Sequence, residues 1–383
     1  MSYFQYYTTR ASRFVYRYPR VNVVLIQINY WLITFVLLCL INYFQIKGIL
    51  LNSDFSLPPL YTIILVAIAI GIIFGLITGV IDLILASTRV GTRVNQMRMY
   101  KVIIIKSSLY LVSFVVAWQM GLLAAKHIIQ PMITMPFNYT SENFRQVFFG
   151  MLLYVTIATI LLNFIKQMNN SFGPGVLLPL FFGRYRHPQF EERVFLFMDL
   201  KGSTPLAEEM SLQSYSKFIR DCFGIINRIL PKYLGQVYQY VGDEIVVSWE
   251  MKDGNEVELC LHFFRRCSKI LEEKKDYFLA HYGVVPQFKA GMHLGIVTAI
   301  EVGEIKREIA FHGNTINTAS RIQTLCNQYQ TNLLISDDFR AHLPDTLQQE
   351  FKYCEEIIMK GKKEKIGIWK EKQATLLKSF AIS

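Results

Sequence analysis

The sequence predicts an N-terminal bundle of four membrane-spanning helices followed by an α+β domain, in which helices flank a sheet rich in antiparallel strands. Two observations lead to this fold class. Hydrophobic residues make up 52% of the chain and charged residues only 18%, whereas soluble domains contain about 25% charged residues. Near residue 190, long apolar runs also give way to short β-rich runs that alternate with amphipathic stretches.

Four apolar stretches are long enough to cross a bilayer, because ~30 Å of hydrocarbon requires ~20 helical residues. They are Val23–Phe44, Tyr61–Leu85, Ser107–Ala125 and Val147–Ile165. Asp82, the one charge in the second stretch, lies in its last turn, where we expect it to reach the membrane–water interface. The stretches contain no buried charge pair and no broken-helix pattern, so a transporter or a channel is not favoured.

The net charge of +11 indicates membrane topology and not a nucleic-acid partner. Residues 1–190 carry 15 Lys and Arg against 3 Asp and Glu, and residues 191–383 carry 25 against 26, so the excess lies entirely in the apolar half. These basic residues concentrate before the first stretch and between the second and third. By the positive-inside rule, the N-terminus, the middle loop and everything after the fourth stretch are cytoplasmic in a multi-pass cell-membrane protein.

A small-residue face on the second stretch is formed by Gly71, Gly75 and Gly79, which repeat the G-x-x-x-G spacing. Such a face lets two helix backbones approach closely. Packing within one four-helix bundle is the favoured interpretation, and contact between two chains is the alternative.

The elements of the α+β domain are predicted from local patterns. The apolar run Val194–Met198 predicts a buried strand, and Thr204 before Pro205 predicts the N-cap and first residue of a helix that continues to Leu230. Gly242 and Asp243 predict a hairpin turn. The further expected elements are strands at Gln236–Tyr240 and Glu244–Trp249, a helix at about Glu256–Lys275, strands near Gln287–His293 and Ile296–Val302, a helix from Thr315 to about Asn327, and strands at Asn332–Ser336, Lys352–Met359 and Lys365–Trp369. Five regions result, namely an N-terminal segment (1–22), a membrane anchor (23–165), a connector (166–192), the α+β domain (193–372) and a tail (373–383).

Two aspartates stand at positions suited to cations and phosphates. Asp199 ends an apolar strand and precedes the segment Gly202–Thr204, where backbone N–H groups at a helix start can face phosphates. Asp243 lies at the tip of the hairpin. Two such carboxylates on adjacent strands can bracket two metal ions for a displacement at phosphorus. Taken alone, each motif is also typical of an ordinary turn.

Two basic motifs complete the set. Asn317 and Arg321 lie four residues apart and so share a helix face, with Arg321 suited to charge on a phosphoryl group. Lys360 and Lys362 lie in a tight basic turn near the C-terminus. The alternatives are an exposed polar helix face and solvated lysines.

In their order and spacing these motifs resemble the class III nucleotide cyclases, over about residues 190–372. The segments that carry the resemblance are Phe197–Thr204, Tyr240–Glu244 and Gly313–Arg321. The resemblance implies that the ribose 3′-hydroxyl of a nucleoside triphosphate attacks its α-phosphorus and that pyrophosphate leaves. It also implies a homodimer anchored in the lipid bilayer, with each site formed by residues of both chains.

The resemblance also implies a role for each site residue. Two Mg²⁺ or Mn²⁺ ions per site would be held by Asp199 and Asp243, with the Leu200 carbonyl as a further ligand. Asn317 would orient the ribose and Arg321 would stabilise the pentavalent phosphorus. The phosphate contacts would come from Gly202, Ser203, Thr204, Lys360 and Lys362.

Base selection departs from the family pattern. Adenylate-forming members usually have Lys, and guanylate-forming members Glu, at the position of Gln239, while the partner position is Ala310. Gln239 and Ala310 therefore leave the substrate open. An adenylate cyclase acting on ATP is favoured because adenylate cyclases are the commoner bacterial members of the family, and a guanylate or dual-specificity cyclase is the alternative. A catalytically weak, nucleotide-binding receptor module is the alternative from another functional class.

Overall fold

The computed structural model describes residues 18–49, 59–95, 97–124, 127, 142–172, 179, 181–305, 307–358 and 365–372. The described chain divides after Phe172 into two compact units. Each unit is described separately below. Lys360 and Lys362 lie outside the described residues.

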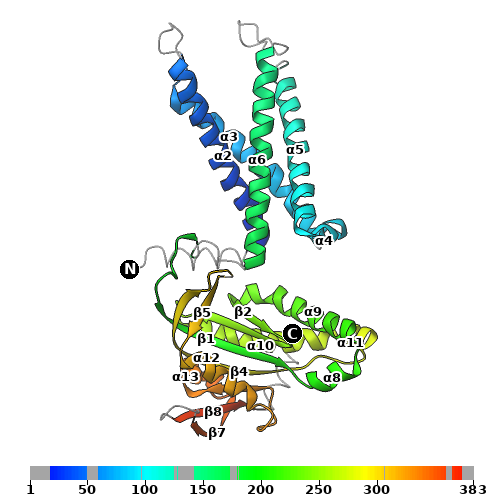
Figure 1. Ribbon diagram of the computed structural model, residues 1–383, viewed down its shortest axis with the longest axis vertical. Helices are drawn as coiled ribbons and strands as arrows, with labels where there is room; N and C mark the ends of the chain where they lie inside the picture. The colour runs from blue at the N-terminus through cyan, green and yellow to red at the C-terminus, as the bar shows by residue number, and fades with distance from the viewer. Residues whose placement is uncertain are drawn as a thin grey trace. The chain divides into compact units, whose positions relative to one another are not determined.

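Four long helices make up the first unit (Figure 1). They are α2 (Pro19–Ile49), α3 (Leu60–Ser87), α5 (Met99–Ala124) and α6 (Glu142–Phe172), with a short helix α4 (Arg89–Asn95) between α3 and α5. All four long helices have the length and hydropathy needed to cross a membrane. The prediction of four long apolar helices is confirmed, and each helix extends beyond the predicted stretch, except that α5 ends one residue earlier. Helix α4 was not predicted.

The glycine face of α3 packs against α2 of the same chain. A Cβ atom added at Gly75 would lie 2.5 Å from the Ile28 Cα, and one added at Gly71 would lie 2.7 Å from the Leu32 Cα. No side chain fits at such distances, so these glycines allow the two backbones to touch. The sequence left open whether this glycine face packs within one bundle or between two chains. In the structure it packs against α2 within one bundle.

We expect Gly75→Leu to disrupt the bundle, because the new side chain would have to displace the α2 backbone. Overpacking of a tight contact typically destabilises a protein by about 1–3 kcal/mol or more. Thermal unfolding in detergent should therefore occur several degrees lower than in the parent protein. Gly121→Leu is the matched control, because a Cβ at Gly121 would meet no atom of the described residues within 4 Å. Equal unfolding temperatures for the two variants would contradict the proposed packing.

The bundle also contains a partly buried charge pair, which the sequence did not predict. The Lys166 Nζ lies 2.6 Å from the Asp82 Oδ2, and the Asp82 side chain is only 9% exposed. Asp82, which was expected to reach the membrane–water interface from the last turn of its stretch, is thus also held by a residue of α6. The pair was missed because the two residues are 84 positions apart in sequence, and Lys166 lies just beyond the fourth predicted stretch.

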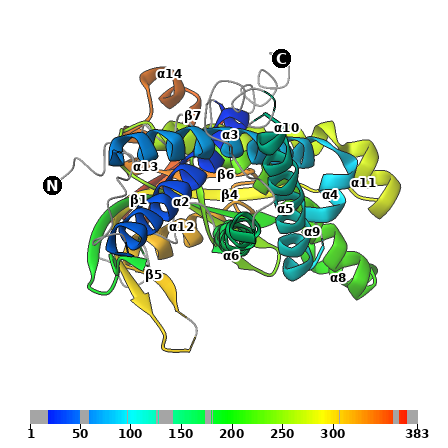
Figure 2. The same ribbon diagram turned by 90° about the horizontal axis from the view of Figure 1, so that it is seen from above.

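The second unit is built on one eight-stranded sheet with the order β2-β3-β1-β4-β6-β8-β7, and β5 pairs with the far part of β4. Its strands are β1 (Gln189–Leu200), β2 (Gln236–Val241), β3 (Glu244–Glu250), β4 (Phe288–Val302), β5 (Glu308–His312), β6 (Leu333–Ser336), β7 (Phe351–Ile358) and β8 (Lys365–Glu371). The β4–β6 pair is parallel and the other strand pairs are antiparallel. The predicted antiparallel-rich sheet is confirmed. Figure 2 shows the end of β4 and β5 projecting from the sheet as a two-stranded arm.

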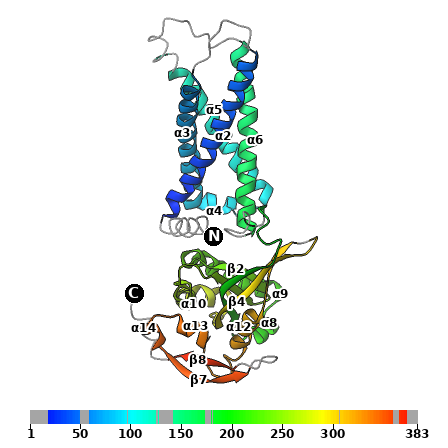
Figure 3. The same cartoon turned by 90° about the vertical axis from the view of Figure 1, so that its left-hand side faces the viewer.

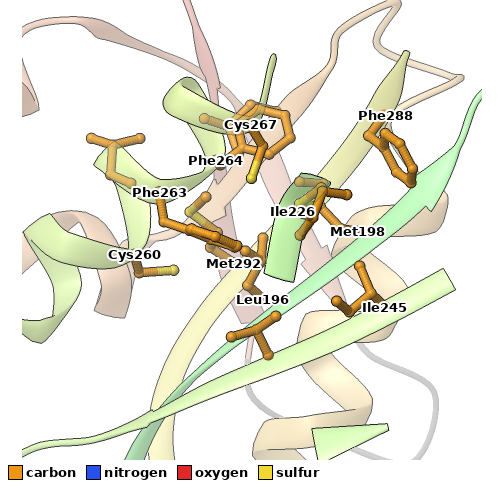
Figure 4. Close-up of a cluster of buried hydrophobic side chains, with 14 of the residues drawn as sticks. Leu196, Met198, Ile226, Ile245, Cys260, Phe263, Phe264, Cys267, Phe288 and Met292 are labelled. Carbon is orange, nitrogen blue, oxygen red and sulfur yellow. The ribbon is translucent and has the colours of Figure 1, made fainter. Parts of the chain in front are cut away.

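Helices cover both faces of this sheet (Figures 1 and 3). They are α8 (Ser203–Glu209), α9 (Leu212–Ile229), a 3-10 turn at Leu230–Tyr233, α10 (Glu256–Glu273), α11 (Lys275–Tyr282), α12 (Asn314–Thr324), α13 (Asp337–Ala341) and α14 (Asp345–Gln348). The larger core lies between the sheet and α9 to α11, where Phe263 and Phe264 pack against Leu196 and Met292 (Figure 4). A smaller core joins α12 to the opposite face through Phe195, Phe197 and Ala319.

Three predicted elements differ from the structure. The helix expected from Thr204 to Leu230 is two helices, because Ser211 caps a new one by accepting a hydrogen bond from the Ser214 N–H. The first of them begins at Ser203 after Gly202, so Thr204 is not its N-cap. The strands expected near residues 287–293 and 296–302 are one continuous strand, β4. Within it, Gly295 makes room for α12, since an added Cβ would lie 2.7 Å from the Thr315 Oγ1.

Candidate active site

The pairing of β1 with its neighbours places Asp199 beside the β2–β3 turn. Asp199 is the second-last residue of β1, and it is paired with Glu244, the first residue of β3. Asp243 directly precedes Glu244 in the turn, so the two aspartates lie at one end of adjacent strands. The Oδ2 of Asp243 is buried and has no hydrogen-bond partner among the described residues. A buried carboxylate oxygen without a partner is unfavourable unless a bound group satisfies it.

Burial and neighbouring carboxylates raise the pKa of two carboxyl groups here, those of Asp199 and Glu244. Burial raises the pKa of Asp199, and Asp243 raises it further, while Lys289 acts in the opposite direction. Burial, reinforced by Asp199 and Asp243, raises the pKa of Glu244 to about 7. A bound divalent cation would reverse this balance, because it favours the ionised forms.

The donor set fits a hard cation such as Mg²⁺, which binds one or two carboxylates and takes its remaining ligands from water and substrate phosphates. Asp199 and Asp243 supply such carboxylates. The described residues contain no group of three or more His, Cys, Asp or Glu side chains arranged to hold a metal ion by themselves. The side chain of Leu200 is buried in the core, so only its backbone carbonyl is available for a cation. The geometry therefore suits a site completed by a bound substrate.

Two partners of Asp199 were missed from the sequence. The Lys289 Nζ lies 3.1 Å from the Asp199 Oδ2, and the Gln323 Nε2 donates to the same oxygen at 3.1 Å. Lys289 comes from β4, in register with Asp199. Its position near the start of a largely apolar strand could have indicated from the sequence that Lys289 has a specific partner.

A cavity of about 450 Å³ opens beside this pair. Its lining includes Lys201, Gly202, Lys289, Asn327, Gln330 and Thr331. These residues present two ammonium groups together with amide and hydroxyl donors, and no carboxylate. Gly202 begins the segment predicted to contact phosphates, while Ser203 and Thr204 form the first turn of α8. The cavity is therefore chemically suited to an anionic group next to Asp199.

The predicted pair Asn317 and Arg321 lies on the outward side of α12. The side of this helix that packs on the sheet carries Thr318, Ala319, Ile322 and other buried residues, whereas Asn317 is exposed and Arg321 half-buried. Helix α12 approaches the sheet closely at Gly291, where an added Cβ would lie 2.3 Å from the Gln323 backbone N. This packing points Gln323 toward Asp199 and leaves Asn317 accessible to another molecule.

The predicted base-selecting residues lie on two strands that the fold joins. A bulge in β2 occurs between Val237 and Gln239, and it leaves Tyr238 unpaired. The Tyr238 ring packs 4.9 Å from the ring of Phe311, and the Phe311 N–H donates to the Tyr238 hydroxyl at 3.4 Å. Ala310 directly precedes Phe311 in β5. Gln239 directly follows Tyr238. Both predicted base-selecting residues are therefore adjacent in sequence to the Tyr238–Phe311 contact, which links β2 to β5.

The second unit is similar in sequence to known catalytic domains. Residues 185–372 match the family described as "Adenylate and Guanylate cyclase catalytic domain". The chain is 30% identical to Adenylate cyclase 2 of Rhizobium meliloti (strain 1021) over 219 residues, which are 57% of this chain and 60% of that protein. It is 27% identical to Adenylate cyclase of Anabaena cylindrica over 183 residues, 46% of this chain and 36% of that protein. The crystal structure of the adenylyl cyclase CyaB from P. aeruginosa is 17% identical, with a TM-score of 0.41, and the match covers 49% of this chain and 96% of that one. The chain thus spans less than two thirds of the length of these two sequence relatives.

Proposed function

Because residues 185–372 are a class III nucleotide cyclase catalytic domain, we propose that the chain is a membrane-bound adenylate cyclase. It converts ATP to 3′,5′-cyclic AMP and pyrophosphate. The observation that supports this most directly is the juxtaposition of Asp199 with the Asp243 turn. There, a buried carboxylate oxygen of Asp243 has no hydrogen-bond partner in the described part of the chain, and a cavity with two lysines lies alongside.

In this proposal each group acts on one part of the nucleotide. Asp199, Asp243 and the Leu200 carbonyl would hold two Mg²⁺ or Mn²⁺ ions, which would supply charge neutralisation at the reacting phosphate and activation of the 3′-hydroxyl. Lys201 and Lys289 line the cavity that would receive the anionic end of the triphosphate. Gly202, Ser203 and Thr204 contribute backbone N–H groups on the same side, and Lys360 and Lys362 supply further charge.

The outward side of α12 supports a shared site. Arg321 would stabilise charge on the pentavalent phosphorus and Asn317 would orient the ribose. Since α12 presents Asn317 to solvent while Gln323 contacts Asp199, we propose that these two residues act on the aspartates of a second copy. A twofold homodimer would then contain two equivalent sites.

The distribution of basic residues favours the membrane topology that the positive-inside rule predicts. We propose a multi-pass cell-membrane protein with both termini in the cytoplasm, because the basic residues flank one end of the spans. The nucleotide site would then face the cytosolic nucleotide pool.

The deciding experiment identifies the product. Purified full-length protein in detergent is given ATP or GTP with Mg²⁺ or Mn²⁺, and the cyclic nucleotide is identified by mass spectrometry. Cyclic AMP from ATP supports the proposal. Cyclic GMP from GTP as the sole product would make the protein a guanylate cyclase, and no product from either nucleotide would support a nucleotide-binding receptor module.

Gln239 provides a test of base selection. A lysine at this position donates to adenine N1, whereas a carboxylate accepts from the guanine N–H groups. We therefore expect Gln239→Lys to raise the ratio of kcat/KM for ATP over GTP by about 10-fold, and Gln239→Glu to lower it by a similar factor. Gln213→Glu, at an exposed position of α9, is the control for charge alone. Unchanged ratios in both Gln239 variants would show that this residue does not contact the base.

A further inference from the structure

A cluster of polar side chains inside the bundle takes one residue from each long helix. Its members are Gln27 of α2, Asp82 of α3, Tyr110 of α5 and Lys166 of α6, called the four-helix polar cluster below. Asp82 accepts from the Gln27 Nε2 at 2.7 Å, from the Tyr110 hydroxyl at 2.6 Å and from the Lys166 Nζ at 2.6 Å. Asp82 is therefore the shared acceptor that ties the other three helices to α3.

The four-helix polar cluster lies in apolar surroundings, which offer its side chains few other polar partners. Gln27 and Tyr110 are fully buried, and neighbouring aromatic rings include Trp31, whose Nε1 donates to the Gln27 Oε1. In an apolar bundle, a charged side chain without its partner is strongly unfavourable. One arrangement of the cluster is thus favoured over any in which Lys166 leaves Asp82.

Lys166 lies close to the end of the helix that leads into the catalytic domain. Helix α6 ends at Phe172, which places Lys166 about 9 Å from its end at 1.5 Å per residue. One turn earlier, the Asn163 Nδ2 donates to the Ser107 Oγ of α5 at 3.2 Å. The last turns of α6 are therefore held by polar contacts to α3 and α5.

We propose that the four-helix polar cluster fixes the end of α6 in the position that makes the cyclase domain active. The proposal rests on the proposed function. A site shared by two chains requires its two halves to be held within a fraction of an ångström. Release of Lys166 would let the end of α6 move and would loosen that alignment. The cluster residues are positioning residues, since they do not touch the nucleotide.

Full-length variants in nanodiscs test the proposal by two readouts. Asp82→Asn and Lys166→Met are each expected to lower the cyclase rate at saturating ATP about 10-fold with little change in KM. Amide hydrogen exchange in the last two turns of α6 should accelerate in parallel. Tyr110→Phe, which loses a single hydroxyl, should lower the rate about 3-fold and serves if the stronger variants do not fold. Lys101→Gln, an exposed lysine of α5, is the control for charge.

Exchanging the two charges provides the rescue. The double variant Asp82→Lys with Lys166→Asp should recover at least half of the lost rate. An unchanged or higher cyclase rate in the folded single variants would overturn the proposal. A lower rate without faster amide hydrogen exchange in α6 would also overturn it, and so would faster exchange with a normal rate. If the parent protein forms no cyclic product, the proposed function fails, and the exchange data alone decide whether the cluster holds α6.

Discussion

Replacing Asp243 with Asn is expected to lower the cyclase rate about 100- to 1,000-fold without destabilising the fold. The rate falls because the variant loses a carboxylate that would hold a metal ion at the reacting phosphate. The fold is retained because the Asp243 Oδ2 is buried with no hydrogen-bond partner among the residues that the structure describes, so its replacement breaks no contact made by that atom there. Measurement of cyclic AMP formation checks the expected loss of rate. Thermal unfolding, measured with and without Mg²⁺ and a non-hydrolysable ATP analogue, checks the expected retention of the fold.

Ligand-dependent unfolding separates a metal ligand from a structural residue. In the parent protein, Mg²⁺ with the analogue should raise the unfolding temperature, because a ligand that binds only the folded state stabilises it. In Asp243→Asn this increase should largely disappear. Asp276→Asn, in α11 away from the site, should behave as the parent. Full activity in Asp243→Asn would exclude Asp243 as a metal ligand.

The sequence predicted the parts of the fold that depend on local patterns. The hairpin around Gly242 and Asp243 was placed to within about one residue, because strand alternation and a turn glycine are short-range signals. The break between α8 and α9 was missed, since Ser211 caps a helix inside a stretch that is otherwise amphipathic. The short strand β5 was also missed, because its residues gain their order from β4 and from Phe311 packing on Tyr238.

Contacts between distant residues account for what the sequence did not predict in the candidate site. Asp199 and Asp243 were expected together because the hairpin follows a predicted strand. Lys289 and Gln323 reach Asp199 from β4 and α12, and only the register of the sheet and the close approach at Gly291 bring them there. The Asp82–Lys166 pair is similar, since helix packing alone joins residues from α3 and α6.

The shared-site proposal makes a quantitative prediction about mixed dimers. Arg321→Ala alone should lower the cyclase rate about 100-fold or more, because it removes charge stabilisation at phosphorus. Asp243→Asn should be equally inactive. When the two variants are co-expressed at equal levels, about half of the dimers contain one chain of each kind, and each such dimer has one intact site out of two. The rate should therefore recover to about one quarter of the parent value.

Co-expression of Asp199→Asn with Asp243→Asn provides the matched control. Both substitutions fall in the same half of the site, so every site in every dimer contains one of them and no activity should return. Recovery in the first pair but not in the second would assign the aspartates to one chain and Arg321 to its partner. If neither pair recovers, although affinity tags show that mixed dimers form, each chain must build its site alone. The outward position of Asn317 on α12 would then need a different explanation.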